Sequence, residues 1–344
     1  MRTILVTGAA GFIGSNFVRM LTERDDTRGT RIIALDKLTY AGNLANIQDL
    51  IDAQKLTFVR GDICDAPAMT RVWDEHGVTD VVHFAAESHV DRSIMSSGPF
   101  IQTNVVGTQV LLDLAKSKNA SRFLNVSTDE VYGSLPEDKP EVKFTEETPL
   151  APNSPYSASK AAADCLVRSY FHTFHMPVLI TRCSNNYGPY HFPEKVIPLF
   201  VTNLLDGEKV PLYGEGANVR DWLFVDDHCR GIQLVVEHGK PGEFYNIGGG
   251  RELSNKELTE KLLEATGRDW SYVENIVDPR GGGHDLRYSV DYSKTAELGY
   301  APRMSFEEGL ALTVQWYRDN RDWWEPLKAS AATAHKPDPG DAEA

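Results

Sequence analysis

The sequence has few cysteines, no long apolar segment and no excess of positive charge. Its four cysteines lie far apart in 344 residues and form no Cys-x-x-Cys pair. This favours reduced, mostly buried thiols over a disulfide framework or a zinc site. No apolar run approaches the roughly 18 residues of a membrane span, and the first strand-like run is too short for the apolar part of a signal peptide. We therefore expect a cytoplasmic protein without a membrane segment.

The net charge is −14, which argues against a nucleic-acid polymer as partner because a phosphate backbone requires a basic face. A small anion can still bind where a few arginines converge. The hydrophobic (41%) and charged (24%) fractions are those of a globular protein with room for one large α/β domain or two lobes.

Short β-branched runs alternate with longer helical patterns in the first half of the chain. Such alternation predicts βαβ units, and hence an α/β fold with a doubly wound parallel sheet and helices on both faces. The expected strands are residues 3–7, 31–35, 57–60, 80–84, 122–126 and 178–181, and the expected helices are residues 12–24, 66–76, 100–118 and 157–175.

The pattern changes after about residue 185 into shorter pieces separated by Pro and Gly, with helices expected at 255–266 and 306–320. We expect residues 1–185 to form the first domain, with part of 218–247 returning to it. Residues 186–328 are expected to form a smaller mixed lobe over the carboxyl edge of the sheet. The Ala-, Pro- and Asp-rich composition of residues 329–344 predicts a disordered tail.

The first expected strand runs into the glycine-rich turn Gly8-Ala9-Ala10-Gly11-Phe12-Ile13-Gly14. Such a turn lets a pyrophosphate approach the backbone at a helix N-terminus, where free N–H groups favour anions. A glycine-rich turn without a ligand would look the same. Asp36, about 20 residues later, strengthens the prediction because a carboxylate there can bind the adenosine ribose and repel a 2′-phosphate, which favours NAD. The neighbouring Lys37 leaves NADP open.

Further candidate residues follow the third and fourth strands. Asp62 and Ala85-Ala86 stand at the edge where a doubly wound sheet binds its ligand. An alternative for Asp62 is the cap of the next helix.

Tyr156 and Lys160 are one turn apart at the start of an expected helix, so their side chains project from one face. Tyrosine, with a pKa near 10, is a poor base at neutral pH. A lysine ammonium and a positive nicotinamide ring would stabilise its phenolate. The same spacing arises by chance, but its position after the glycine turn and after the strand end Ser127-Thr128 favours catalysis.

That strand end continues into two adjacent acids, Asp129 and Glu130. If both face a cleft, burial and mutual repulsion should raise one pKa and give an acid and a base side by side. The alternative is a solvated pair that caps the next element.

The glycine turn, the Tyr156/Lys160 pair and the strand end resemble the extended short-chain dehydrogenase/reductase superfamily, which has a Rossmann-type sheet. Within it, the chain resembles the dTDP-glucose 4,6-dehydratases over about residues 2–325. The stretches that carry this resemblance begin at Asp36, Ala85, Ser127, Ser184 and Arg220 and read DKLTYAGN, AAESHVDRS, STDEVYG, SNNYGPYHFPEK and RDW.

The resemblance implies conversion of dTDP-glucose to dTDP-4-keto-6-deoxyglucose and water, with bound NAD and no metal. Tyr156 would take the C4 hydroxyl proton as hydride passes to NAD, and Lys160 would lower the tyrosine pKa. Glu130 would then remove the C5 proton while Asp129 protonates the departing C6 hydroxyl. Thr128 would bond the C4 oxygen. The hydride would return to C6 and a proton to C5, which regenerates NAD.

The resemblance also implies two sets of binding residues. The NAD set is Gly8, Gly11, Phe12, Ile13, Gly14, Asp36, Lys37, Leu38, Thr39, Asp62, Ile63, Phe84, Ala85, Ala86, Ser88, Thr103, Val126, Tyr156, Lys160 and Asn186. The nucleotide-sugar set is Ser88, Thr128, Asn185, Glu194, Lys195, Val196, Pro211, Leu212, Tyr213, Arg220, Asn255, Arg280 and His284. Arg220 is expected on the diphosphate. Arg280 and His284 lie in a loop that is longer and richer in glycine than the family's usual Asp-Arg-Pro-Gly-His-Asp.

Two other functions fit part of the pattern. A nucleotide-sugar 4-epimerase needs no C5 base or C6 acid, so Asp129 and Glu130 favour dehydration. An inactive NAD or sugar-nucleotide sensor is disfavoured because Tyr156, Lys160 and Glu130 are all present. The histidines show no metal-ligand spacing, and His191 and His284 are expected to be site-lining or structural.

By analogy with relatives, helices 100–118 and 157–175 would form a homodimer interface. A stripe facing the core would look the same. The apolar residues in question are Val105, Leu111, Leu112, Cys165, Leu166 and Phe171.

Overall fold

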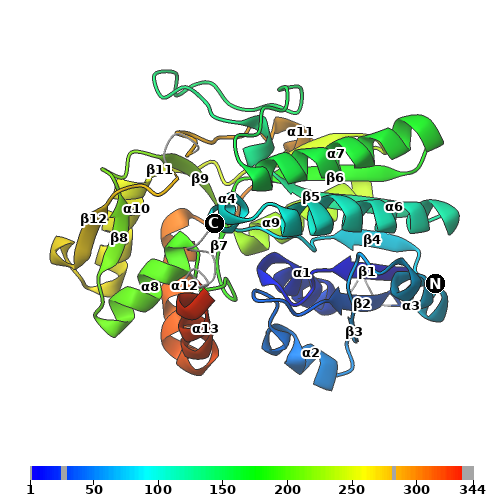
Figure 1. Ribbon diagram of the computed structural model, residues 1–344, viewed down its shortest axis with the longest axis horizontal. Coiled ribbons are helices and arrows are strands. Elements are labelled where there is room, and N and C mark those ends of the chain that lie inside the picture. The colour runs from blue at the N-terminus through cyan, green and yellow to red at the C-terminus, as the bar shows by residue number, and fades with distance from the viewer. Residues whose placement is uncertain (1, 25–28, 281–283, 335–344) are drawn as a thin grey trace, which may run out of the picture.

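The computed structural model describes residues 2–24, 29–280 and 284–334. In these residues, seven parallel strands form the main sheet in the order β10-β6-β5-β4-β1-β2-β3 (Figure 1). The direction of strand order reverses between β1 and β4, which is where doubly wound sheets bind ligands. The bounds are β1 Thr3–Thr7, β2 Arg31–Asp36, β3 Thr57–Arg60, β4 Asp80–His83, β5 Arg122–Thr128, β6 Val178–Cys183 and β10 Phe244–Ile247. The predicted α/β fold is confirmed.

Two strands run two residues further than the sequence pattern predicts. β5 and β6 stay paired through Ser127↔Arg182 and Thr128↔Cys183, although these residues are polar or small. The extra pairing fixes Thr128 and Cys183 at the carboxyl edge of the sheet, beside each other.

Helices cover both faces of the main sheet. On one face, α1 (Phe12–Glu23) and α9 (Val225–His238) share a buried core with the strands. On the other, α3 (Ala66–His76), α6 (Thr108–Ser117) and α7 (Pro155–Phe174) do the same. The short α2 (Gln48–Asp52) follows the turn η2 (Leu44–Asn46).

The helix predicted at residues 100–118 is three segments. The short α5 (Gly98–Phe100) leads into a π-helical stretch, η3 (Ile101–Gly107), and then into α6. Such π-helical turns recur near functional sites. Here the buried Asn104 donates to the Glu87 carbonyl at 3.0 Å and to Ser159 Oγ at 2.8 Å, so η3 is tied both to the loop after β4 and to α7.

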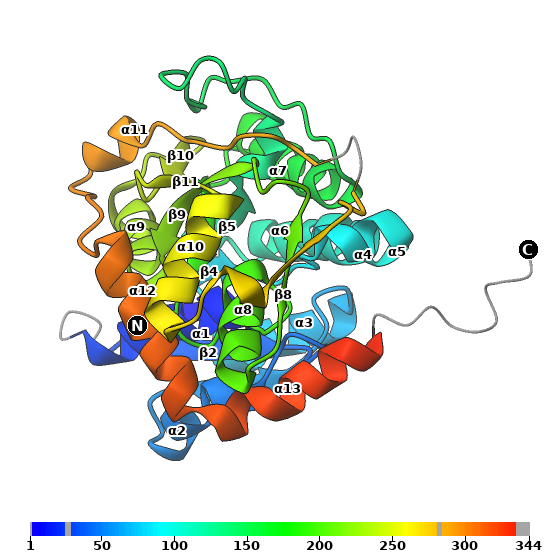
Figure 2. The ribbon, with the colours of Figure 1, turned by 90° about the vertical axis from the view of Figure 1, so that its left-hand side faces the viewer.

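The smaller lobe is mixed, as predicted (Figure 2). β9 (Val219–Phe224) pairs in parallel with β7 (Asn185–Tyr187) and antiparallel with β11 (Glu252–Ser254), while β8 (Val210–Tyr213) pairs with β12 (Val273–Ile276). The helices α8 (Val196–Asp206), α10 (Asn255–Thr266) and α12 (Phe306–Asp319) pack around a second core. Three further short helical segments are α4 (Val90–Met95), η5 (Trp270–Tyr272) and α11 (Ser293–Ala296).

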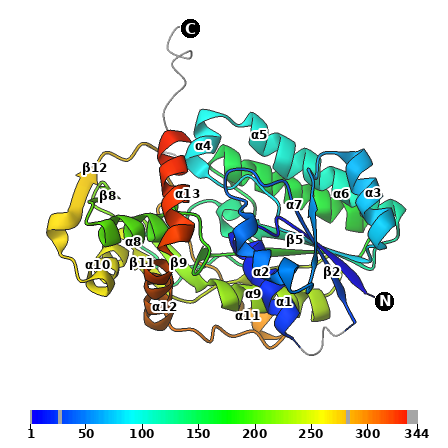
Figure 3. The same cartoon turned by 90° about the horizontal axis from the view of Figure 1, so that it is seen from below.

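The last helix, α13 (Arg321–Ala334), lies between the smaller lobe and the main sheet (Figure 3). Trp323 Nε1 donates to Asn46 Oδ1 at 2.8 Å, and Lys328 Nζ pairs with Asp206 at 2.8 Å. The disordered tail predicted from residue 329 is wrong for residues 329–334, which continue this helix because alanine-rich sequence has high helix propensity. Residues 335–344 lie outside the described residues.

All four cysteines are free, but they differ in burial. Cys183 and Cys229 are buried, Cys64 is half-buried and Cys165 is exposed. The prediction of buried thiols is therefore wrong for Cys165, which lies on the outer face of α7. Within the part of the chain that the structure describes, no helix combines the length and apolar character needed to cross a membrane.

Candidate active site

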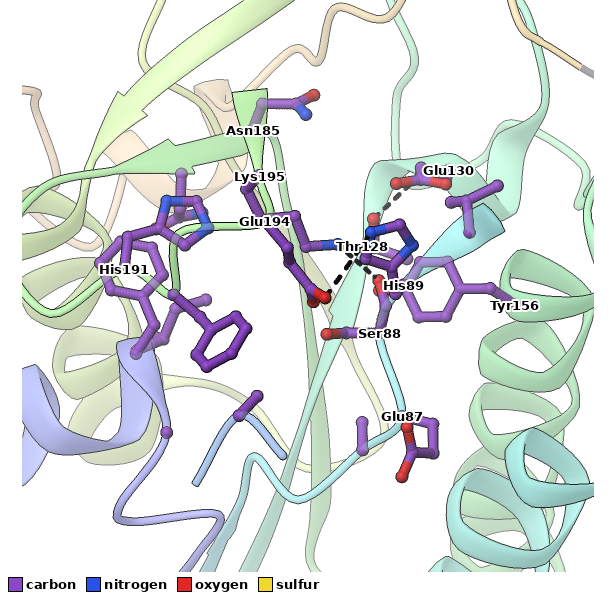
Figure 4. A pocket seen from close by; sticks show the side chains of 18 of the residues that line it. Glu87, Ser88, His89, Thr128, Glu130, Tyr156, Asn185, His191, Glu194 and Lys195 are labelled. Atoms are coloured by element: carbon purple, nitrogen blue, oxygen red, sulfur yellow. Dashed lines mark hydrogen bonds and ion pairs between the residues drawn. The ribbon is translucent and has the colours of Figure 1, made fainter. Parts of the chain in front are cut away.

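A cavity of about 470 Å³ opens at the carboxyl edge of the main sheet and extends into the smaller lobe. In Figure 4, Thr128, Glu130 and Tyr156 approach it from one side, and Asn185, His191 and Lys195 from the other. Ser88 and Glu87, from the loop after β4, lie between them.

The glycine turn after β1 packs without space for side chains. Gly8 has φ +69°, which an L side chain rarely adopts, and a Cβ at Gly14 would lie 2.1 Å from the Gly8 carbonyl oxygen. Gly11 is the N-cap of α1, no side chain caps this end, and the first turn contains no acid. The free N–H groups therefore form an anion site at the cavity wall.

Asp36 supports this turn from the end of β2. Its carboxylate accepts from the Ala10 N–H at 3.0 Å and from the Leu38 N–H at 2.8 Å. Lys37 Nζ lies 2.7 Å from Asp62 Oδ2. The lysine that could have favoured the 2′-phosphate of NADP is therefore paired with a carboxylate. Asp62 is not the helix cap, because Asp65 caps α3.

Tyr156 and Lys160 lie in the first turns of α7, whose start is fixed by a capping box between Ser154 and Ser157. Both side chains line the cavity. Lys160 Nζ donates to the Val126 carbonyl at 2.8 Å, which ties the catalytic helix to the strand that carries the acids.

The electrostatics of Tyr156 differ from the sequence prediction. Burial, followed by the charge of Glu130, raises the pKa of the Tyr156 hydroxyl well above its usual value. Burial also lowers the pKa of Lys160. In the protein alone Tyr156 is therefore a neutral phenol, and lowering its pKa requires a further positive charge.

Asp129 and Glu130 form the turn η4 (Asp129–Tyr132) directly after β5. Asp129 is 1% exposed, and its Oδ2 has no hydrogen-bond partner among the described residues. Burial, then the charges of Glu130 and Asp221, raises the pKa of Asp129 well above its usual value. Burial also raises the pKa of Glu130, but Lys195, Arg220 and Arg280 oppose that rise. The solvated-pair alternative is wrong.

Three further cations, Lys195, Arg220 and Arg280, line the cavity and form its cationic wall. Lys195 Nζ donates to the Ser88 carbonyl at 2.9 Å. The Arg220 guanidinium donates to the Asp285 carbonyl at 2.9 Å and lies over the Tyr288 ring. Arg280 pairs with Asp91 at 2.5 Å, which joins the lengthened loop to the helix after β4.

The ends of the lengthened loop are held together. His284 Nδ1 lies 2.6 Å from Asp278 Oδ2, and its Nε2 lies 3.3 Å from Arg280 Nη1. Residues 281–283 lie outside the described residues. Arg280 and His284 face the cavity despite the altered spacing.

The structure brings the predicted binding residues together at this one cavity, with a single exception. Leu38 does not line it: this residue has φ +57° and packs on the core beside α1, and only its N–H contributes, by holding Asp36. His191, which was expected to be either site-lining or structural, lines the cavity. Its ring stacks on Phe12, with the ring centroids 4.0 Å apart.

Several lining residues were not predicted individually. Glu87, His89 and Asp91 were within reach, because they belong to the AAESHVDRS stretch that carries the resemblance. Tyr288 comes from far along the chain in a run without any motif. The unpredicted polar lining residues include Glu87, His89, Asp91, Ser127, Cys183, Ser184, Thr259, Asp285 and Tyr288.

Comparisons with known proteins agree with this geometry. The family model described as GDP-mannose 4,6 dehydratase matches residues 5–313. The dTDP-glucose 4,6-dehydratase of Streptomyces antibioticus is 56% identical over 341 residues, which cover 98% of each chain. The chain belongs to the dTDP-glucose 4,6-dehydratase family.

Solved structures place the family among related enzymes. The dTDP-glucose 4,6-dehydratase DesIV of Streptomyces venezuelae, solved with NAD and dTDP bound, has a TM-score of 0.89 and 55% identity, covering 94% of this chain and 99% of that one. The UDP-glucose 4-epimerase of Thermotoga maritima, solved with UDP-glucose, has a TM-score of 0.83 and 32% identity, covering 93% and 99%. The dehydratase family therefore shares its fold with epimerases, and residue chemistry must separate the two activities.

Proposed function

We propose that the protein binds NAD and converts dTDP-glucose to dTDP-4-keto-6-deoxyglucose and water. The observation that carries this proposal is the buried pair Asp129 and Glu130, which shares one cavity with Tyr156 and with the glycine turn. An epimerase has no use for a second acid and base at this position, whereas elimination of water across C5 and C6 requires both.

The residues at the sheet edge fit NAD. The uncapped start of α1 suits its pyrophosphate. Asp36 suits the adenosine ribose, and Lys160, which lines the same cavity, suits the nicotinamide ribose. When bound, NAD supplies an acceptor for the C4 hydride and returns that hydride to C6. We assign the predicted NAD set to this role, with Leu38 acting only through its backbone.

Tyr156 is the proposed base for the C4 hydroxyl. Its pKa is raised in the protein alone, so the positive nicotinamide ring and the Lys160 ammonium together have to favour the phenolate. We assign Thr128 to the C4 oxygen; its hydroxyl interacts with both Tyr156 and Asp129, which supports this role.

The surroundings of the two acids suggest their separate roles. Burial and the neighbouring carboxylates raise the pKa of Asp129, which favours its protonated form and suits the acid that protonates the C6 hydroxyl as it leaves. Glu130 faces Lys195, Arg220 and Arg280, which favour its carboxylate, and this suits the base that removes the C5 proton.

The cationic wall suits the nucleotide diphosphate. We assign Arg220 to the diphosphate and the rest of the predicted substrate set to the nucleotide and sugar. The experiment is incubation of the purified protein with dTDP-, UDP-, CDP- and GDP-glucose, followed by detection of an alkali-sensitive 4-keto product. We expect the dTDP-sugar to react fastest; a C4-epimerised sugar with its C6 oxygen retained would contradict the proposal.

We further propose a cytoplasmic homodimer that pairs through the outer faces of η3, α6 and α7. Ile101 (47% exposed) and Cys165 lie on the outside, which supports such a face. Leu111 and Leu112, which sequence analysis included, are buried in the core instead. We also propose the division of the chain into domains at residue 185. Sedimentation equilibrium measures the oligomeric state, and a monomer at micromolar concentration would contradict the proposed homodimer.

A further inference from the structure

The side-chain amide of Asn186, on β7, has a protein partner at both its nitrogen and its oxygen. Its Nδ2 donates to the Ser184 carbonyl at 2.9 Å, and its Oδ1 lies 2.9 Å from His228 Nδ1. A carbonyl only accepts, so the amide nitrogen must face Ser184 and the amide oxygen must face His228. The oxygen is an acceptor, so His228 carries its proton on Nδ1. One Asn186 N–H remains for another partner.

His228 is a neutral donor in this arrangement. It lies in the first turns of α9, it is 0% exposed, and burial lowers its pKa to about 3. The other ring nitrogen, Nε2, is buried and has no hydrogen-bond partner among the described residues. A buried acceptor without a partner is destabilising, so the imidazole is not the side chain that packing alone would favour.

The remaining N–H of Asn186 lies near the catalytic end of the cavity. Asn186 lines the cavity together with Cys183, which pairs with Thr128 at the end of β5, and the Asn186 amide interacts with the Cys183 thiol. Sulfur is a weak acceptor, so a ligand oxygen can readily take the N–H. Asn186 lines the cavity, and its free hydrogen can only donate.

We propose that His228 is a positioning residue for NAD: it holds the Asn186 amide so that the free N–H donates to an oxygen at the nicotinamide end of the cofactor. This inference rests on the proposed function, since it needs NAD in the cavity. His228 does not itself line the cavity and acts through Asn186. Without the Nδ1 donor, the amide oxygen loses its partner and only the Ser184 carbonyl orients the amide, so the free N–H is held less firmly toward the ligand oxygen.

The test compares three variants that remove the imidazole. His228→Asn keeps a donor at the δ position, His228→Gln moves the polar atoms to the ε position, and His228→Leu removes them. Holoenzyme is purified, and the rate at which NAD leaves it is measured by passing it into buffer that contains an NAD-consuming dehydrogenase. Affinity for dTDP and the melting temperature are measured on the same samples.

We expect His228→Leu and His228→Gln to release NAD about tenfold faster, the effect of one neutral hydrogen bond. We expect His228→Asn to stay within about threefold of the parent, and dTDP affinity to be unchanged in all three. Asn186→Asp should match His228→Leu, and the double variant should be no worse than either, because both changes remove the same donor.

The outcomes separate this inference from the proposed function. Parent protein that neither retains nor binds NAD overturns both. Parent protein that retains NAD while the Gln and Leu variants release it at the parent rate overturns only the role of His228. Equal acceleration in Asn, Gln and Leu variants also overturns it, because a merely structural imidazole would be missed equally in all three. Should the Leu variant fail to fold, the Asn and Gln pair decides alone.

Discussion

Arg182 and Asp164 form a buried ion pair behind the active site, with an Nε–Oδ2 distance of 2.9 Å. Asp164 lies one helical turn after Lys160 on α7, and its charge opposes the fall that burial causes in the pKa of Lys160. Arg182 also donates to the Tyr132 hydroxyl at 3.0 Å, in the turn that carries the two acids. The pair thus joins the catalytic helix to the acidic turn.

Asp164→Asn should lower the free energy of unfolding by about 3 kcal/mol, because it leaves the guanidinium of Arg182 buried without its anion. Urea denaturation measures the effect. The matched control is Glu325→Gln, which breaks the exposed Arg321–Glu325 pair on α13; we expect about 0.5 kcal/mol or less there. Equal losses in the two variants would show that burial of the first pair has no energetic consequence.

Tyr156→Phe should reduce turnover by on the order of 10² or more, since it removes the base for C4 oxidation while keeping the ring in place. No absorbance of reduced cofactor should appear when substrate is added. Normal turnover would mean that the Tyr156/Lys160 spacing is a chance feature of α7.

Glu130→Gln keeps the shape of the side chain and removes the base for the C5 proton. C4 oxidation should persist while elimination slows by roughly 10² to 10⁴. In the parent protein, deuterium placed at C4 should appear at C6 of the product, and C5 should take its hydrogen from solvent. Label that stays at C4, or water loss unaffected by the substitution, would contradict the roles given to the two acids.

Asp129→Asn should inactivate the enzyme yet stabilise it above about pH 4. The pKa of Asp129 is raised in the folded protein, so the folded state holds a proton that the unfolded chain releases near pH 4. Its contribution to stability is therefore full below about pH 4 and is lost as pH rises through the folded pKa. Urea denaturation at about pH 5 and about pH 8 should show a larger gain for the variant at the higher pH. A gain independent of pH would contradict the raised pKa.

The protein should purify with NAD bound and turn over without added cofactor, because one hydride is taken and returned on the same sugar. NADP should bind at least about 10²-fold more weakly, since a 2′-phosphate would meet the Asp36 carboxylate while Lys37 is paired with Asp62. Steady accumulation of NADH during turnover would contradict the first expectation, and a requirement for NADP the second.

Local patterns predicted six of the seven strands of the main sheet but not β10, for which only a return of part of residues 218–247 was expected. Residues 3–7, 57–60 and 66–76 were predicted with the observed bounds of β1, β3 and α3, because their hydrophobic periodicity and flanking turns act within a few residues. The strand ends at Thr128 and Cys183 were missed because they depend on pairing between β5 and β6, which residue propensity does not contain.

Tertiary contacts account for the errors at the site. Leu38 follows Asp36 in a stretch that carries the resemblance, but its positive φ turns its side chain to the core. Leu111 and Leu112 lie on a helix with an apolar stripe, and periodicity cannot tell a core from an interface. The pairing of Asn186 with His228 spans 42 positions, and no motif spacing indicates it.

The return of β10 to the edge of the main sheet gives the molecule an order of assembly. β10 pairs with β6, and Ile232 and Val235 of α9 complete the core beneath α1. A ribosome has to release all of β7, α8, β8 and β9 before these pieces emerge. Until residue 247 has left the ribosome, β6 therefore has an unpaired strand edge. The glycine turn and α1 also lack the core contacts that α9 provides. A cut after residue 185 would make that exposure permanent, so the cofactor half cannot be expected to survive as an independent fragment.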